Sequence, residues 1–160
     1  MKSKIDIFSK KKLKKSRDKL AVRNSANHFL FNEINKRLAE RLLLIKKNFF
    51  KTLELGSRTG ATLKNLPKEK KIKKFFFTDI SHKMLVKAKK EIKFDKLIKK
   101  KVFINLNEES LPFKEKTFDL VISNLYLHWS NNIVGSLAEI NRILKPDGLF
   151  LASFFGDETL

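Results

Sequence analysis

Apolar residues along the chain follow two alternating patterns. Short, nearly continuous apolar runs that end in polar or glycine residues predict buried strands. These runs lie at 49–55, 72–79, 101–106, 117–124 and 149–154. Between them, apolar residues recur at intervals of three and four, which predicts helices. The helical segments lie at about 26–45, 59–66, 81–94 and 131–144.

Because strands alternate with helices, we expect an α/β fold with a doubly wound, mostly parallel sheet of five strands. Ligands bind such sheets at the carboxyl ends of the strands. The run Phe75, Phe76 and Phe77 has no polar residue within it, which predicts a strand buried on both faces. Ser25 or Asn27 is available to cap the helix predicted at about 26–45.

Residues 1–24 differ in composition from the predicted domain at 25–160. They carry ten lysine and arginine residues against two aspartates. Their few apolar anchors are Ile7, Phe8, Leu13 and Leu20. A segment of this kind folds poorly alone, so we predict a solvated, partly helical arm that lies along the domain surface. A dedicated RNA-binding arm is the alternative.

The whole chain carries a formal net charge of +19. Clustered cations would favour a nucleic-acid partner, but these cations are spread along the chain. A generally lysine-rich composition is therefore the favoured explanation, and a nucleic-acid partner is not favoured. The absence of cysteine excludes disulfides, cysteine-ligated zinc and thiol catalysis. No apolar run is long enough to span a bilayer, so we predict a cytoplasmic protein without a membrane span.

One stretch, Leu53–Gly60, combines an acidic residue with a glycine-bracketed turn. Glu54 lies near the end of a predicted strand, and Gly56 and Gly60 enclose the turn into the next helix. Glycine lets the backbone approach a ligand closely and adopt a positive φ. Asp79 ends the next predicted strand, 19 residues after Gly60. Nucleoside-binding βαβ units place a ribose-binding carboxylate at an interval of about 20 residues.

Further motifs follow this turn in a fixed order. They are Thr78–Leu85, Leu111–Phe113, Thr117–Leu125, Leu127–Trp129 and Leu144–Gly148. With the turn at 54–60, this series resembles class I S-adenosylmethionine-dependent methyltransferases. It is most similar to the branch that holds the biotin-pathway malonyl-carrier-protein methyltransferase and a mitochondrial complex I assembly factor that hydroxylates an arginine. The Ile7–Phe8 start, Phe29–Phe31 and the segment 155–160 are closer to the assembly factor.

The resemblance implies a Rossmann-like fold and S-adenosylmethionine as the cofactor. Glu54 and the turn from Gly56 to Gly60 would hold the methionine end of the cofactor, because its ammonium suits a carboxylate. Asp79 would accept hydrogen bonds from both ribose hydroxyls. Ile80 would lie against the adenine face.

Two later segments complete the implied cofactor site. Asn107 and Glu108 would meet the adenine edge. Asn124 and Leu125, at the end of the fourth strand, would face the reacting methyl group or the substrate. His128 is a weak candidate for a general base. The favoured alternative makes Trp129 a core anchor and His128 a hydrogen-bonded spacer.

Three features depart from the family pattern. Arg58 stands where the family has a middle glycine, so it would either strain the backbone or put a large side chain near the cofactor. Asn107 stands where the family has an aspartate, which keeps an acceptor but removes a charge. The family's C-terminal hairpin is missing, so the fifth strand is predicted to be an edge open to a partner or to self-association.

Other candidates for chemistry have simpler explanations. His28, His82 and His128 lie on separate predicted elements without ligand spacing, so we predict no metal site. The pair Glu108 and Glu109 suits a solvated loop better than acid–base catalysis. Tyr126 is either a substrate contact or a residue at the rim of the site.

Three functions stay open. The favoured function is an S-adenosylmethionine-dependent methyltransferase that acts on a protein or carrier-bound acyl substrate. A second is a complex I assembly factor, non-catalytic or of the hydroxylase type, that keeps the fold. A third is an RNA methyltransferase that uses the basic arm.

Overall fold

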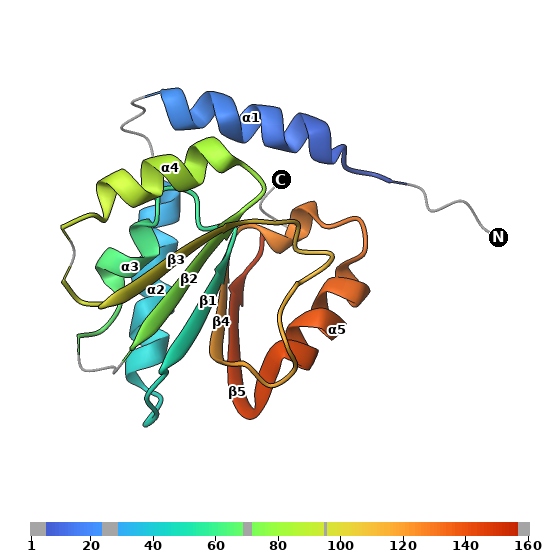
Figure 1. The fold of residues 1–160 in the computed structure, drawn as a ribbon. Helices are drawn as coiled ribbons and strands as arrows, with labels where there is room; N and C mark the ends of the chain where they lie inside the picture. Colours follow the sequence, from blue (N-terminus) through green and yellow to red (C-terminus); the bar gives the residue numbers. More distant parts are fainter. Residues whose placement is uncertain (1–5, 24–28, 69–71, 95, 157–160) are drawn as a thin grey trace.

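The computed structural model describes residues 6–23, 29–68, 72–94 and 96–156, which build a five-stranded sheet with helices around it (Figure 1). The strands are β1 (Lys51–Leu55), β2 (Lys74–Asp79), β3 (Lys100–Asn105), β4 (Phe118–Asn124) and β5 (Leu144–Ser153). Their order is β3-β2-β1-β4-β5, and every neighbouring pair is parallel. The predicted doubly wound α/β fold is confirmed. The strand order reverses between β1 and β4, which is where such sheets bind ligands.

Helices cover both faces of the sheet and one of its ends (Figure 1). They are α1 (Lys10–Val22), α2 (Phe29–Leu43), α3 (Ala61–Asn65), α4 (His82–Glu91), the 3-10 helix η1 (Leu127–Trp129) and α5 (Ile133–Ile143). Side chains of α2, α3 and α4 share one apolar cluster with the sheet, whereas α5 packs into a second cluster. α1 lies along α4, across the end of the sheet where the strands finish.

The phenylalanine run of β2 divides between these two clusters. Phe75 and Phe77 pack with the α2, α3 and α4 side of the core, and Phe76 packs on the α5 side. All three are buried, with exposed fractions of 0%, 9% and 0% from Phe75 to Phe77. This alternation follows from the period of two along a strand. It confirms that β2 is buried on both faces.

β5 begins earlier than the sequence predicts. The residues Lys145–Gly148 are predicted to form a turn before a strand at 149–154, but they lie inside β5. Phe118 pairs with Leu144 and Leu120 pairs with Leu149, so the extra residues of β5 form an irregularity in the ladder. Pro146 donates no N–H, and an outer strand tolerates such a residue at a bulge.

The N-terminal arm is more ordered than predicted. Ser9 caps α1 by accepting a hydrogen bond from the Lys12 N–H, and Arg17 of this helix is buried. Ile7, predicted as an apolar anchor, is 76% exposed. The arm does lie along the domain, as expected. The cap candidates Ser25 and Asn27, and the last part of the 155–160 motif, lie outside the described residues.

Candidate functional site

The turn after β1 has a backbone that requires glycine. Gly56 has a φ of 66° and Gly60 a φ of 74°, both in the left-handed region. A Cβ atom on Gly56 would lie 2.2 Å from Cγ of Tyr126. The Tyr126 ring therefore packs directly on the bare backbone of this turn. A Cβ on Gly60 would lie 3.3 Å from its nearest neighbour, Ile92, so the requirement for glycine at position 60 comes mainly from its φ.

Arg58 lies in the middle of the same turn with a φ of 51°. One of the two expected consequences, the strained backbone, is found, and a side chain near the cofactor stays a prediction. The backbone takes a conformation that favours glycine, and the guanidinium lies 3.8 Å from the centre of the Phe31 ring. Burial, and then the nearby Arg17 cation, lower the pKa of Arg58 to about 10. The side chain thus stays cationic at neutral pH beside the site.

Asp79 collects several donors at the end of β2. Its Oδ1 accepts the Ser81 N–H at 2.8 Å, and its Oδ2 accepts the Arg58 N–H at 3.1 Å. The same Oδ2 accepts a hydrogen bond from Nη1 of Arg17 at 2.7 Å. Asp79 is 1% exposed, so its carboxylate contacts Arg17 of α1 and not solvent. The partner that covers Asp79 was not predicted from the sequence.

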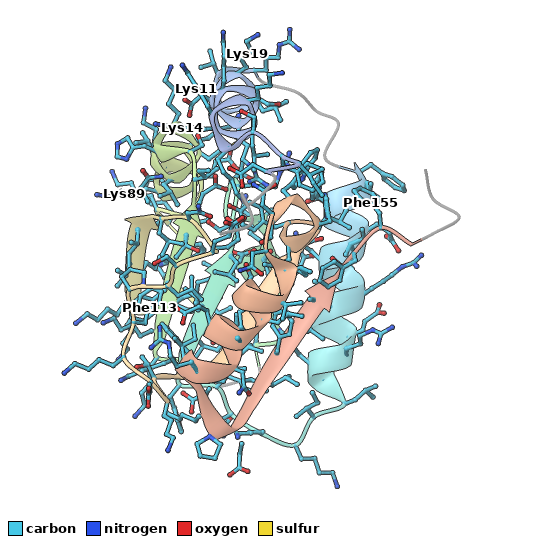
Figure 2. All side chains as sticks on the ribbon, turned by 90° about the vertical axis from the view of Figure 1, so that its right-hand side faces the viewer. Lys11, Lys14, Lys19, Lys89, Phe113 and Phe155 are labelled. Carbon is cyan, nitrogen blue, oxygen red and sulfur yellow. The ribbon has the colours of Figure 1, made fainter. Side chains whose placement is uncertain are left out.

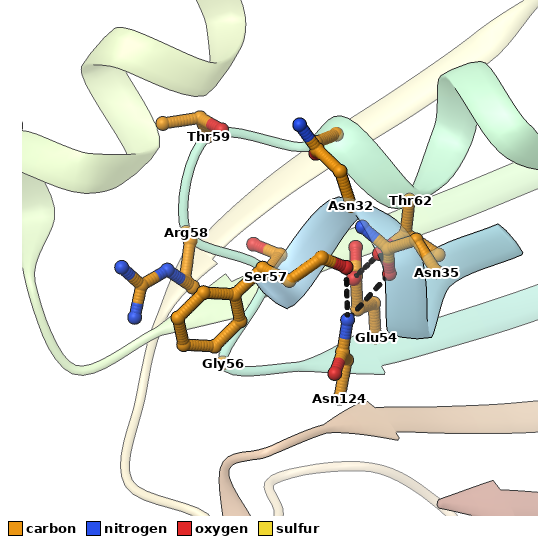
Figure 3. A pocket seen from close by; sticks show the side chains of 11 residues that line it. Asn32, Asn35, Glu54, Gly56, Ser57, Arg58, Thr59, Thr62 and Asn124 are labelled. Carbon is orange, nitrogen blue, oxygen red and sulfur yellow. Dashed lines mark hydrogen bonds between the residues drawn. The ribbon is translucent and has the colours of Figure 1, made fainter. Parts of the chain in front are cut away.

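Glu54 lies in a buried polar cluster with Thr62, Asn35 and Asn124 (Figure 3). Its Oε1 forms a hydrogen bond with the Thr62 hydroxyl, whose oxygen also lies 2.8 Å from Oδ1 of Asn35. Its Oε2 has no hydrogen-bond partner among the described residues. Burial, only partly offset by Thr62, raises the pKa of Glu54 from 4.5 to about 8. Glu54 is therefore mostly protonated at neutral pH.

Asn124 ties the end of β4 to α2 and β5. Its amide nitrogen donates to Oδ1 of Asn35 at 2.6 Å and to the Phe31 carbonyl at 3.1 Å. Its Oδ1 accepts the Ser153 hydroxyl at 3.0 Å. Leu125, the next residue, is buried with a φ of 46°. The predicted pair thus lies at the site edge, with the Asn124 amide fully used by protein partners.

The loop after β3 brings a second carboxylate toward the site. Glu108 is 0% exposed, accepts the Tyr126 hydroxyl at 2.7 Å and forms an ion pair with Lys10 of α1. Asn107 uses its Oδ1 to accept the Glu109 N–H within the loop. Ile80 is half-buried directly after β2. Glu108 is therefore a buried, paired group, and the predicted solvated loop is wrong at that position.

Two aromatic assignments near β4 are corrected. Trp129, predicted as a core anchor, is 37% exposed, and His128 has a buried Nδ1 without a hydrogen-bond partner in the described part of the chain. Burial, and then the Arg17 cation, lower the pKa of His128. Tyr126, predicted at a rim or as a substrate contact, is 1% exposed. Leu127 of η1 takes the core place that Trp129 leaves.

Four contributors to this region were missed from the sequence. They are Lys10, Arg17, Asn35 and Thr62. Asn35 carried a signal, because it sits on the apolar stripe of its helix between Phe31 and Leu38, where a polar residue needs a buried partner. Arg17 carried no comparable signal within a run of lysines. Across residues 6–23, 29–68, 72–94 and 96–156, no cluster of three or more histidine, aspartate or glutamate side chains could hold a metal ion.

A small cavity of about 20 Å³ opens beside this cluster. Its lining includes Glu54, Gly56, Arg58 and Asn124, but neither Asp79 nor Glu108. The open space therefore covers only one half of the predicted site. The other half is filled by Tyr126 and by side chains of α1. None of the helices described here is long and apolar enough to cross a bilayer.

Comparison with known proteins gives one family and several relatives. A family model described as a methyltransferase domain matches residues 53–152. The chain is 42% identical over 132 residues to the mitochondrial arginine-hydroxylase NDUFAF5 of Homo sapiens, a match covering 82% of this chain and 36% of that protein. It is 27% identical over 148 residues to the malonyl-[acyl-carrier protein] O-methyltransferase of Halorhodospira halophila, covering 92% of this chain and 49% of that protein.

A solved structure shares the fold. The phosphoethanolamine N-methyltransferase 1 of Haemonchus contortus, in complex with phosphoethanolamine and S-adenosylhomocysteine, superposes with a TM-score of 0.74 at 20% identity. The match covers 94% of this chain and 33% of that chain. At this identity the likeness concerns the fold alone. The chain spans between about a third and a half of the length of the two curated relatives.

Proposed function

Because this chain belongs to the family of methyltransferase domains, we propose that it binds S-adenosylmethionine and transfers its methyl group to a protein or carrier-bound acyl substrate. The observation that carries the proposal is the placement of Glu54, Gly56 and Asp79. They lie at the carboxyl ends of β1 and β2, two adjacent parallel strands. This is the place where a nucleoside cofactor meets such a sheet.

The donor and acceptor chemistry of these residues fits the cofactor. Oε2 of Glu54 is a buried acceptor without a partner in the described residues, and Glu54 lines the cavity. The ammonium of the methionine end would lower the raised pKa of Glu54 and pair with its carboxylate form. Asp79 has two carboxylate oxygens, and these suit a vicinal diol. Gly56 has no side chain between the turn and a ligand.

The chain's own residues position the reaction rather than move protons. S-adenosylmethionine supplies, when bound, a methyl group on a sulfonium sulfur that is ready for transfer. Asn124 is held by Asn35, Phe31 and Ser153, so the end of β4 is a rigid wall of the site. Methyl transfer depends mainly on holding donor and acceptor in line. No proton transfer by His128 is part of the proposal.

The names of two relatives suggest two classes of substrate for this chain. The printed name of the Halorhodospira relative supports a carrier-bound malonyl group. The higher identity to a protein named arginine-hydroxylase favours a second candidate, modification of a protein arginine on the same fold. The cytoplasmic location belongs to this proposal, and a mitochondrial location is the alternative that the human relative's name supplies.

Calorimetric titration with S-adenosylmethionine and with S-adenosylhomocysteine tests the cofactor. We expect binding by the wild type and at least about tenfold weaker binding by Asp79→Asn, because the amide loses the charge and one acceptor that the diol uses. Asp147→Asn is the matched control, since it removes the same charge from an exposed residue of β5. Equal binding by both variants would remove Asp79 from the site. No heat with any of the proteins would reject the cofactor.

The acceptor is then tested with a methyl-labelled cofactor. Transfer of the label to malonyl-carrier protein, and not to an arginine-containing peptide, is the expected result. Label on the peptide alone would replace the carrier-bound acyl substrate by a protein arginine. Hydroxylation transfers no methyl group, so it would appear instead as a gain of one oxygen atom in the mass of the unlabelled peptide.

A further inference from the structure

α1 buries a cation where an amphipathic helix would bury an apolar residue. Arg17 is the buried residue of this helix, with an exposed fraction of 3%. The lysines Lys11, Lys14 and Lys19 point away from the domain (Figure 2). Arg17 alone among these cations is withdrawn from water. Burying a charge is costly unless a partner compensates it, so the contacts of Arg17 decide how α1 is held.

The contacts of Arg17 are with the predicted ribose site. Its Nη1 lies 2.7 Å from Oδ2 of Asp79, and its guanidinium carbon lies 4.6 Å from the centre of the Tyr126 ring. Tyr126 in turn packs on Gly56. Arg17 and Tyr126 together therefore cover the surface between the glycine turn and Asp79. A ribose could not use Oδ2 of Asp79 while Arg17 holds it.

Contacts on both sides of Arg17 fix α1 in this position. Lys10, two helical turns earlier, pairs with Glu108 and lies 3.1 Å from Oε1 of Glu109. Asp18 accepts a hydrogen bond from the Ser81 hydroxyl at 2.5 Å, at the N-cap of α4. One face of α1 is thus attached to each segment predicted to contact the ribose or the adenine.

The segment before α1 adds a further attachment. The backbone of Phe8 exchanges two hydrogen bonds with the Asn131 side chain, at 2.7 and 2.9 Å. The Phe8 ring meets the Trp129 ring edge to face, with centres 5.4 Å apart. These contacts are polar or partly exposed, so they are easier to separate than an apolar core contact. α1 is held by specific pairs and not by a buried apolar stripe.

We propose that α1 is a latch that competes with the cofactor, with Arg17 taking the place of the ribose hydroxyls on Asp79. This inference rests on the proposed function. It explains why the open cavity reaches Glu54 and Gly56 but not Asp79 or Glu108. Cofactor entry then requires Arg17 to leave Asp79. A latch that keeps the closed state at about nine-tenths of the molecules weakens the apparent affinity about tenfold.

Calorimetry on Arg17→Gln, beside the wild type, tests the latch. We expect S-adenosylhomocysteine to bind this variant about tenfold more tightly, because glutamine cannot form the ion pair with Asp79. Arg23→Gln is the matched control. It removes the same charge from the exposed C-cap of α1, and its affinity should equal that of the wild type. Thermal melts of the three proteins verify that each is folded.

Hydrogen exchange on the unmodified protein gives a readout that does not depend on a variant. Adding S-adenosylhomocysteine should speed the exchange of α1 amides, since the bound state releases the helix. Slower exchange in α1 would mean that the helix closes over the ligand, and it would overturn the latch. Equal or weaker binding by Arg17→Gln would also overturn it and leave the proposed function intact. If neither the wild type nor Arg17→Gln binds, the cofactor function fails and the latch fails with it.

Discussion

The two ends of the sheet hold carboxylates in opposite electrostatic states. Glu54 at the carboxyl end of β1 is buried with one oxygen unpartnered in the described residues, and its pKa is raised to about 8. Asp119 at the amino end of β4 accepts hydrogen bonds from the Lys145 ammonium and the Lys51 N–H. Burial alone would raise the pKa of Asp119, but these donors outweigh it and lower the pKa. The carboxylate of Asp119 is satisfied, whereas that of Glu54 has an unused acceptor.

Unused polar atoms gather at the same end. Five buried side-chain atoms in the described residues have no hydrogen-bond partner, and four belong to residues at or near the carboxyl ends of β1 and β4. These four are Glu54 Oε2, Ser57 Oγ, Ser123 Oγ and His128 Nδ1. The positive φ angles of Arg58 and Leu125 lie there too. Strain and unsatisfied groups persist where the rest of the fold holds them, which is typical of a binding site.

The largest predicted effect comes from Gly56→Ala at the strained end. The new Cβ would lie within 2.2–2.7 Å of three Tyr126 ring atoms, at a φ of 66°. Overpacking and the left-handed backbone together should lower the free energy of unfolding by about 3 kcal/mol. Urea denaturation measures this loss.

Gly156→Ala is the matched control, because a Cβ there meets no heavy atom within 4 Å. Its free energy of unfolding should change by less than about 0.5 kcal/mol. A similar loss in both variants would mean that the Tyr126 contact does not set the cost at Gly56.

The sequence predicted the sheet better than it predicted the side chains of α1 and Tyr126 that cover the site. Strand runs such as Phe75–Phe77 need burial on both faces, and only a central parallel strand provides it, so the fold followed from local pattern. Glu54, Gly56 and Asp79 were placed together because turn chemistry and interval are local as well. The family expected from the motifs is confirmed by the match to residues 53–152.

Contacts between distant segments were not predicted. Arg17 and Asp79 are 62 residues apart, and nothing in the pattern of α1 distinguishes Arg17 from the neighbouring lysines. Trp129 was expected in the core because of its size, yet Leu127 fills that place and Trp129 packs against Phe8. Such pairings depend on how elements approach one another, which a local pattern does not specify.

Glu54→Gln should give the next largest effect and remove the pH response that Glu54 gives to stability. The folded state keeps a proton that the unfolded state loses between pH 4.5 and about 8, so wild-type stability should fall as pH rises through that window. Glutamine has no proton to lose, so the variant should exceed the wild type at high pH by on the order of 2 kcal/mol. Thermal melts across pH measure the difference.

Asp119→Asn is the control at the other end of the sheet. Asp119 has a lowered pKa, so its contribution is present above the ordinary value of 3.8 and is lost as pH falls through the folded value. The asparagine variant should therefore be less stable than the wild type at neutral pH and lose that difference in acid. If the Glu54 variant were also less stable than the wild type at neutral pH and lost that difference in acid, Glu54 would be paired and ionised. The contrast between the two ends of the sheet would then fail.

The smallest effect on stability is expected from Arg58→Gly, although its effect on binding should be clear. Glycine relieves a left-handed backbone conformation that costs arginine about 1–2 kcal/mol. It also loses the stacking on Phe31 and gains chain entropy in the unfolded state, and each of these lowers the free energy of unfolding by about 0.5–1 kcal/mol. These terms nearly cancel, so unfolding should change by less than about 1 kcal/mol. Removing a half-buried cation beside the cavity should nevertheless tighten binding of the sulfonium cofactor severalfold. Calorimetry measures this change. Arg58→Lys keeps both the charge and the backbone strain, so it should bind the cofactor like the wild type. Unchanged or weaker binding by the glycine variant would show that Arg58 contributes to cofactor binding and does not hinder it.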